Sequence, residues 1–220
     1  MWQAWCRGEK VGPEIVSGAP VTRKTVLHLG CGQAYIHALP KYFQKGWQEI
    51  RLDIDPDAHP DILGTALDMP TVPTGSVDAV YSSHMLERLY AHELPVALAE
   101  MKRVLKPDGI LVATVSDLQT VARMIVEDRL LETAYESLAG SITPYDMTYG
   151  HRGFLRSGKL YIAHRGGFTL TTLVAALKEA GFAAATGKRR ESAFDLWVLA
   201  APEPMADDQL IQLSATVLPD

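Results

Sequence analysis

The sequence has few cysteines, and it has no long apolar run. Its two cysteines, Cys6 and Cys31, form neither a CxxC pair nor a disulfide framework, which favours a reducing compartment. The longest apolar runs, such as residues 110–113, fall far short of the roughly 20 residues that span a bilayer. Charged side chains within residues 7–10 interrupt any secretory signal. We therefore expect a cytoplasmic protein without a membrane segment.

The sequence also lacks an excess of basic side chains. It has 21 Lys and Arg against 26 Asp and Glu, so its formal net charge is −5 at pH 7. This balance argues against a surface for polyanions, and we expect the one basic cluster, residues 188–190, to be a solvated strand end with no nucleic-acid partner. A length of 220 residues with 47% hydrophobic side chains indicates a single globular domain over residues 1–220.

Strand-like and helical segments alternate along the chain, which favours an α/β layered domain. Strands are expected at residues 25–29, 49–53, 77–81, 110–115, 182–187 and 193–200, and helices at 92–105, 117–138 and 169–181. We expect a core over about residues 22–200. Residues 140–167 have few apolar side chains and are expected to cap a site, and residues 201–220 are expected to form a loosely held tail.

A glycine-rich turn follows the first predicted strand. Gly30-Cys31-Gly32 stands 21 residues before Asp53, which ends the second predicted strand. This layout is typical of a mononucleotide-binding βαβ unit, in which the acid binds ribose hydroxyls. A dinucleotide site needs Gly or Ala at the third position of G-x-G-x-x-G/A, where this chain has Tyr35. A nucleoside ligand without phosphate is therefore favoured, and an NAD-dependent oxidoreductase remains an alternative.

Four stretches in the same order resemble the motifs of class I S-adenosylmethionine-dependent methyltransferases of the small type-11-like group. They are VLHLGCG (26–32), DMP (68–70), GSVDAVYSSHMLE (75–87) and RVLKPDG (103–109). The similarity covers about residues 25–116. It implies a Rossmann-like, doubly wound, mostly parallel seven-stranded sheet with an antiparallel C-terminal hairpin. It also implies methyl transfer from S-adenosylmethionine to an O, N, S or C nucleophile.

The resemblance also implies which residues bind the cofactor. The implied cofactor-binding residues are His28, Gly30, Cys31, Gly32, Asp53, Ile54, Asp68, Met69, Ser82 and Ser83. Candidates for a general base, needed only if the acceptor loses a proton, are His84, Asp117, His151 and His164. The acidic balance and the small size favour a small-molecule acceptor, and a homodimer is left open.

Three positions depart from the family pattern. His28 stands where an acid is common, Thr65 where many members have an acid that binds the adenine amine, and Arg88 where a histidine is common. A catalytically silent partner or regulatory protein with the same fold is therefore a second alternative.

No metal site is expected. The seven histidines have no zinc-type spacing, and residues 53–64 lack the Gly and Glu that a calcium loop requires. Asp55 and Asp57 are accordingly expected to be solvated loop charges, and Cys31 to be a small packing residue.

Overall fold

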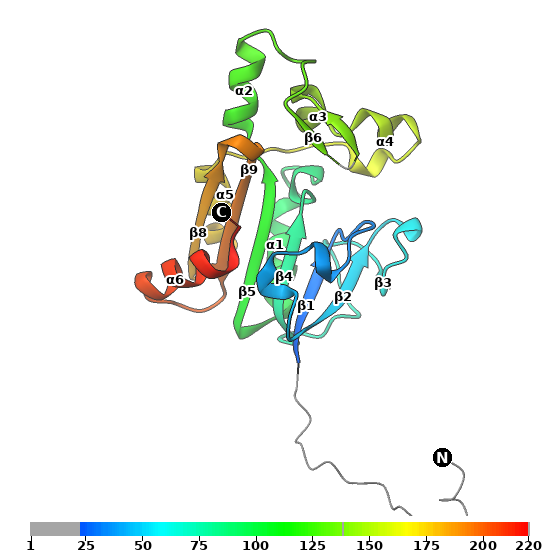
Figure 1. Ribbon diagram of the computed structural model, residues 1–220. Coiled ribbons are helices and arrows are strands. Elements are labelled where there is room, and N and C mark those ends of the chain that lie inside the picture. The colour runs from blue at the N-terminus through cyan, green and yellow to red at the C-terminus, as the bar shows by residue number, and fades with distance from the viewer. Residues whose placement is uncertain (1–22, 138, 220) are drawn as a thin grey trace, which may run out of the picture.

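The computed structural model describes residues 23–137 and 139–219, so Cys6 lies outside the described residues. Within these ranges, one sheet has the strand order β3-β2-β1-β4-β5-β9-β8 (Figure 1). Its strands are β1 (Lys24–Leu29), β2 (Trp47–Asp53), β3 (Ile62–Leu63), β4 (Val77–Ser83), β5 (Leu105–Ser116), β8 (Ala184–Arg190) and β9 (Asp195–Ala201). Strands β1 to β5 are parallel, and β9 pairs antiparallel with both β5 and β8. The predicted sheet is confirmed.

Helices and short turns connect these strands. The α-helices are α1 (Leu94–Val104), α2 (Leu118–Val126), α3 (Pro144–Tyr149), α4 (Arg152–Arg156), α5 (Leu170–Glu179) and α6 (Asp207–Val217). The 3-10 turns are η1 (Ile36–Ala38), η2 (Lys41–Phe43), η3 (Pro56–Ala58), η4 (Leu86–Arg88), η5 (Leu160–Ile162) and η6 (Glu191–Ala193). A separate hairpin consists of β6 (Tyr135–Ser137) and β7 (Gly140–Ile142). None of the helices in the described part of the chain has the length and apolar character that crossing a bilayer requires.

Both faces of the sheet are covered, because successive side chains of a strand point to opposite faces. On one face, Leu98 of α1 and Leu173 of α5 pack in the larger apolar core. On the other face, Phe43 of η2 packs with Leu210 and Val217 of α6. The expectation of a loosely held tail is therefore wrong for α6, whose buried apolar side chains complete the second layer.

The connection between β1 and β2 contains no α-helix. Residues 30–46 form η1 and η2 instead, with Pro40 between these turns. Proline inside a helix removes a backbone donor and clashes with the preceding turn, which disfavours one continuous helix here. The predicted βαβ unit therefore lacks the helix N-terminus that would hold a pyrophosphate.

Helix α2 ends at Val126, so the helix predicted over residues 117–138 is wrong in its second half. Asp128 adopts the left-handed conformation (φ 60°), and the Arg129 N–H donates to the Met124 carbonyl at 3.0 Å. A hydrogen bond from an N–H to the carbonyl five residues earlier is typical of the Schellman motif at the C-terminus of a helix. The chain continues into β6, β7, α3, α4 and η5, which we call the cap (residues 135–137 and 139–164) and which lies beyond one end of the sheet (Figure 1).

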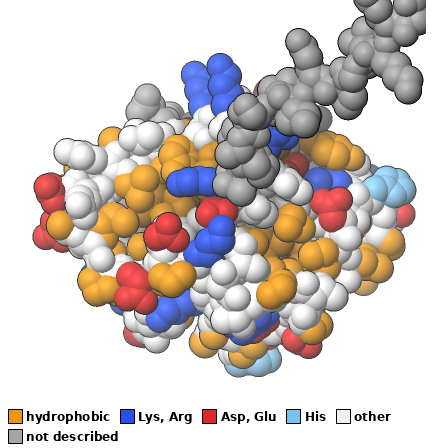
Figure 2. Space-filling model, turned by 90° about the horizontal axis from the view of Figure 1, so that it is seen from below, with side chains coloured by type: hydrophobic (Ala, Val, Ile, Leu, Met, Phe, Trp, Pro, Cys, Tyr) orange, Lys and Arg blue, Asp and Glu red, His pale blue; other side chains and the backbone are white. Residues whose placement is uncertain are grey.

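The opposite end of the molecule has mixed charge. Figure 2 shows this end, where Lys and Arg side chains are interspersed with Asp and Glu among apolar and neutral groups. Charges of both signs give this face no continuous field that would attract a polyanion.

Candidate active site

Two adjoining cavities lie at the carboxyl ends of the parallel strands. The cap cavity, of about 390 Å³, lies between the strand ends and the cap. The edge cavity, of about 260 Å³, lies beside the end of β2 and residues 64–67. Asp53, Arg88 and Tyr161 line both cavities. Open α/β sheets bind ligands at this end, so the two cavities are the candidate site.

The glycine turn opens toward these cavities. Gly30 (φ 65°) and Gly32 (φ 50°) both have left-handed backbones, which favour glycine. A Cβ on Gly30 would lie 2.8 Å from the Met85 side chain, whereas a Cβ on Gly32 would meet nothing within 4 Å. Gly32, which lines the cap cavity, thus leaves room for a ligand beside the backbone.

The amides of this turn already have acceptors. The Gly30 and Cys31 N–H groups donate to the Leu52 carbonyl (2.9 and 3.4 Å), and the Gly32 N–H donates to Asp53 Oδ2 (2.7 Å). Phosphate-binding turns instead present free N–H groups. This geometry argues against the NAD-dependent alternative.

Asp53 is 6% exposed and ends β2. Its Oδ2 accepts from Gly32, and its Oδ1 accepts from the Asp55 N–H at 2.9 Å. Each carboxylate oxygen can accept a further hydrogen bond, so the group retains capacity for two hydroxyl donors. The ribose of a nucleoside fits this requirement.

Six apolar side chains line the edge cavity. They are Leu52, Ile54, Ala66, Leu67, Met85 and Leu89. Thr65 also lines the cavity, and its hydroxyl accepts from the Leu67 N–H at 3.3 Å. An apolar enclosure beside a ribose-binding carboxylate fits the adenosine part of S-adenosylmethionine.

Several predicted cofactor residues line neither cavity. They are His28, Cys31, Asp68, Met69, Ser82 and Ser83. His28 Nδ1 instead lies 2.8 Å from Glu49 Oε1, and its ring contacts Tyr81 edge-on on the face that η2 covers. Met69 is buried in the larger core. The wall of the edge cavity that was predicted to contain residues 68 and 69 is formed by residues 64–67. The structure thus places these six side chains outside the walls of both cavities.

Cys31 behaves as a packing residue. Its side chain is buried, and burial raises the pKa of the thiol to about 11. The thiol therefore stays protonated near neutral pH and is a poor nucleophile.

His84 and Glu87 form a pair at the end of β4. His84 lines the cap cavity and has a left-handed backbone (φ 49°), which is uncommon for a residue with a side chain. Its Nδ1 lies 3.0 Å from Glu87 Oε1, which also accepts from the Ser116 N–H at 3.3 Å. Enclosure by protein disfavours the imidazolium, but the hydrogen bond and charge of Glu87 outweigh it and raise the pKa of His84. With Nδ1 facing the carboxylate, Nε2 is left to accept a proton.

The other candidate bases have different surroundings. His151 and His164 line the cap cavity. His164 Nδ1 lies 2.9 Å from the Met147 carbonyl, and burial lowers the pKa of His164. Asp117 is fully buried, pairs with Arg189 at 2.6 Å and lines neither cavity. Asp117 is therefore a structural residue, which corrects its place among the candidate bases.

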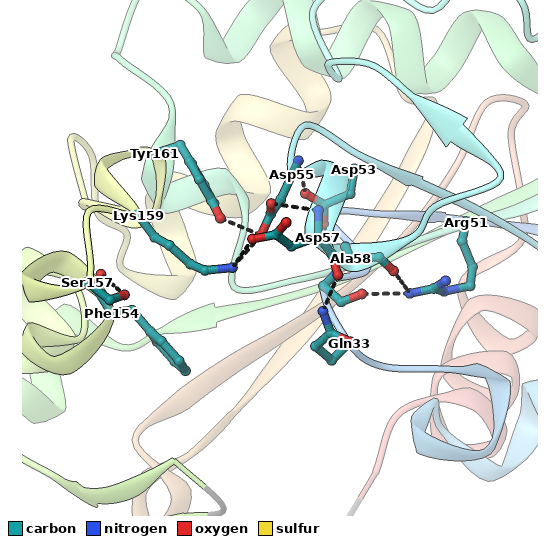
Figure 3. A network of polar contacts seen from close by, with 11 residues as sticks. Gln33, Arg51, Asp53, Asp55, Asp57, Ala58, Phe154, Ser157, Lys159 and Tyr161 are labelled. Carbon is teal, nitrogen blue, oxygen red and sulfur yellow. Dashed lines mark hydrogen bonds and ion pairs between the residues drawn. The ribbon is translucent and has the colours of Figure 1, made fainter.

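The cap is bound to the β2 end through Asp55 (Figure 3). Lys159 Nζ lies 2.8 Å from Asp55 Oδ2, and the Tyr161 hydroxyl donates to the same oxygen. The hydrogen bonds from Lys159 and Tyr161 lower the pKa of Asp55. Asp57 is 78% exposed, with Lys159 3.5 Å away. The prediction of a solvated charge is thus wrong for Asp55, because the cap covers it.

Arg51 fixes the loop beneath this link. Its guanidinium donates to the carbonyl oxygens of Gly32 (2.6 Å) and Ala58 (2.9 Å), as Figure 3 shows for Ala58. The glycine turn is thereby tied to η3. Among the described residues, no group of three or more His, Cys, Asp or Glu is arranged to hold a metal ion.

Comparisons with known proteins agree with this geometry. Residues 27–113 match the model of a methyltransferase domain family. A search of curated proteins gave no significant match.

Solved structures show the same fold at low sequence identity. The CMeT domain of the citrinin polyketide synthase is 13% identical, with a TM-score of 0.56 over 86% of this chain. This chain spans only 48% of that protein. A methyltransferase of Methanosarcina mazei is 18% identical, with a TM-score of 0.54 over 83% of this chain and 94% of that protein. A Pyrococcus horikoshii OT3 protein is 14% identical, with a TM-score of 0.53 over 82% of this chain and 84% of that protein.

The family match coincides with the residues that carry the glycine turn, Asp53 and the His84–Glu87 pair. The cavities beside them fit S-adenosylmethionine rather than a dinucleotide. Residues 27–113 therefore match a methyltransferase domain, and the chain has the fold of S-adenosylmethionine-dependent methyltransferases.

Proposed function

We propose that this methyltransferase acts on a small molecule held in the cap cavity. The observation that carries the proposal is that His84, paired with the buried Glu87, lines that cavity, while Asp53 lines both cavities. A volume of about 390 Å³ lies within the range of small-molecule sites, about 300–1,000 Å³. The acceptor atom is an O, N, S or C nucleophile.

The cofactor is assigned to the edge cavity and its boundary with the cap cavity. Asp53 accepts hydrogen bonds from the ribose, Ile54 and Leu67 contact the adenine, and Gly32 lets the methionine part approach the backbone. When bound, S-adenosylmethionine supplies an electrophilic methyl group on a sulfonium sulfur.

The chain aligns the acceptor and removes its proton. His84 Nε2 accepts the proton, while Glu87 orients the ring through Nδ1 and stabilises the imidazolium. The cap excludes water, and His151 and His164 contact the acceptor from the cap side. Alignment of this kind supplies up to about 7–11 kcal/mol, and a general base contributes about 10²–10⁴-fold.

The test measures S-adenosylhomocysteine released from a panel of small phenols, carboxylic acids, amines and thiols. With an acceptor that turns over, His84→Ala should lower kcat by about 10²–10⁴-fold and leave the Kd for S-adenosylhomocysteine unchanged. His92→Ala is the matched control, because His92 is exposed and lines neither cavity. Equal kcat values for the two variants would exclude His84 as the base.

A further inference from the structure

Arg88 lies in the wall shared by the two cavities, where its guanidinium has no hydrogen-bond partner among the described residues. It ends η4 and is partly buried. Within residues 23–137 and 139–219, no group accepts a hydrogen bond from its guanidinium or forms an ion pair with it, and its Nε is buried. Burial lowers the pKa of Arg88, but a guanidinium stays charged in proteins.

The carboxylates around Arg88 are already engaged. Asp55 binds Lys159 in the cap link. Asp146 accepts from Arg152 Nε at 2.8 Å and from Arg152 Nη2 at 3.0 Å. Glu87 holds His84, and Asp53 accepts two backbone amides. Within the described part of the chain, the charges of Glu87 and Asp53 therefore act on Arg88 without a hydrogen bond to its guanidinium.

A ligand group can supply what the protein does not. A partly desolvated cation without a hydrogen-bonded anion is unfavourable. A ligand carboxylate beside Arg88 would supply the hydrogen-bonded anion, and the planar guanidinium matches the two oxygens of a carboxylate.

We propose that Arg88 binds a carboxylate group of a ligand in this site. The inference deepens the proposed function and rests on it, because it names a group that a ligand of the reaction must carry. Two sources are within reach of a side chain that lines both cavities: the amino-acid end of the cofactor and the methyl acceptor.

The experiment uses binding equilibria of the full chain, so it needs no known acceptor. Arg88→Met removes the charge at similar length, and Arg88→Lys keeps the charge but not the planar donor pair. Arg156→Met is the matched control, because Arg156 is an exposed arginine of the cap that lines neither cavity. Calorimetry compares S-adenosylhomocysteine with 5′-methylthioadenosine, which lacks the amino-acid end. Ligand-observed NMR compares benzoate with benzamide on protein saturated with S-adenosylhomocysteine.

Two results support the proposal and identify the source. If the cofactor supplies the carboxylate, Arg88→Met weakens S-adenosylhomocysteine about 10- to 100-fold, leaves 5′-methylthioadenosine unchanged, and Arg88→Lys is intermediate. If the acceptor supplies the carboxylate, wild type and Arg88→Met bind both nucleosides equally. Benzoate then binds wild type but not Arg88→Met, and benzamide binds neither protein. The proposal is wrong if neither the nucleosides nor benzoate distinguish Arg88→Met from wild type. Failure of wild-type protein to bind S-adenosylhomocysteine would instead overturn the cofactor placement on which the proposed function depends.

Discussion

Replacing Asp53 by Asn tests the placement of the cofactor most directly. The substitution keeps the size of the side chain and one carbonyl oxygen, but it removes the negative charge. Hydrogen bonds to a charged acceptor contribute about 1.5–3 kcal/mol, against about 0.5–1.5 kcal/mol for a neutral one. Two ribose hydroxyls would therefore lose about 2–3 kcal/mol together, which corresponds to a Kd about 30- to 150-fold higher.

The assay is calorimetric titration with S-adenosylhomocysteine, with thermal unfolding measured in parallel. Asp53 also accepts the Gly32 and Asp55 amides, so Asp53→Asn should lower the stability of the free protein as well. The parallel measurement separates this effect from binding. Asp57→Asn changes an exposed acid of the same loop and should bind like wild type. A wild-type Kd for Asp53→Asn, together with reduced stability, would show that this carboxylate serves only the backbone and would refute the placement.

Three further variants test the base, a helix start and the cap. Glu87→Gln removes the charge that raises the pKa of His84, so the imidazole should lose its proton at lower pH, and the acid limb of the kcat/KM profile should move to lower pH. Thr169→Ala removes the side-chain cap of α5 and should lower the free energy of unfolding in urea by about 1 kcal/mol. Gly150→Ala places a Cβ 2.8 Å from the Ile162 carbonyl oxygen at φ 98° and should displace the cap, lowering turnover more than affinity for S-adenosylhomocysteine.

Each of these variants has a control or an opposing outcome. An acid limb at the wild-type pH in Glu87→Gln would show that Glu87 does not act on the base. Thr171→Ala changes an exposed threonine of the same helix and should not destabilise it, since alanine favours helix. Gly158→Ala meets no atom within 4 Å at a similar φ of 90°, so it isolates backbone strain from the clash. Equal effects of Gly150→Ala and Gly158→Ala would contradict the role given to the Ile162 contact.

Local patterns in the sequence were sufficient for much of the fold. Apolar runs bounded by turns predicted the main strands, and the Thr169 cap and Gly181 stop predicted α5, because these signals depend on neighbouring residues only. The glycine turn and Asp53 were predictable for the same reason. Periodicity failed over residues 117–138, where a left-handed Asp128 ends the helix within an otherwise helical pattern.

Contacts between distant segments could not be derived in this way. Asp55 and Lys159 are 104 residues apart, so only the folded chain showed that a loop acid joins β2 to the cap. Successive side chains of β1 also point to opposite faces of the sheet, and this alternation places His28 against Tyr81 instead of at a cavity.

The sequence by itself determined the main strands, the open glycine turn and the acid that follows it, because each depends on residue type and local spacing. Only the tertiary structure decided that Glu87 orients His84, that Asp117 is structural and that Arg88 has no partner within the described chain. The physical reason is that the burial and pairing of a charge depend on which segments meet at the strand ends. Those meetings are not encoded in any one stretch of the chain.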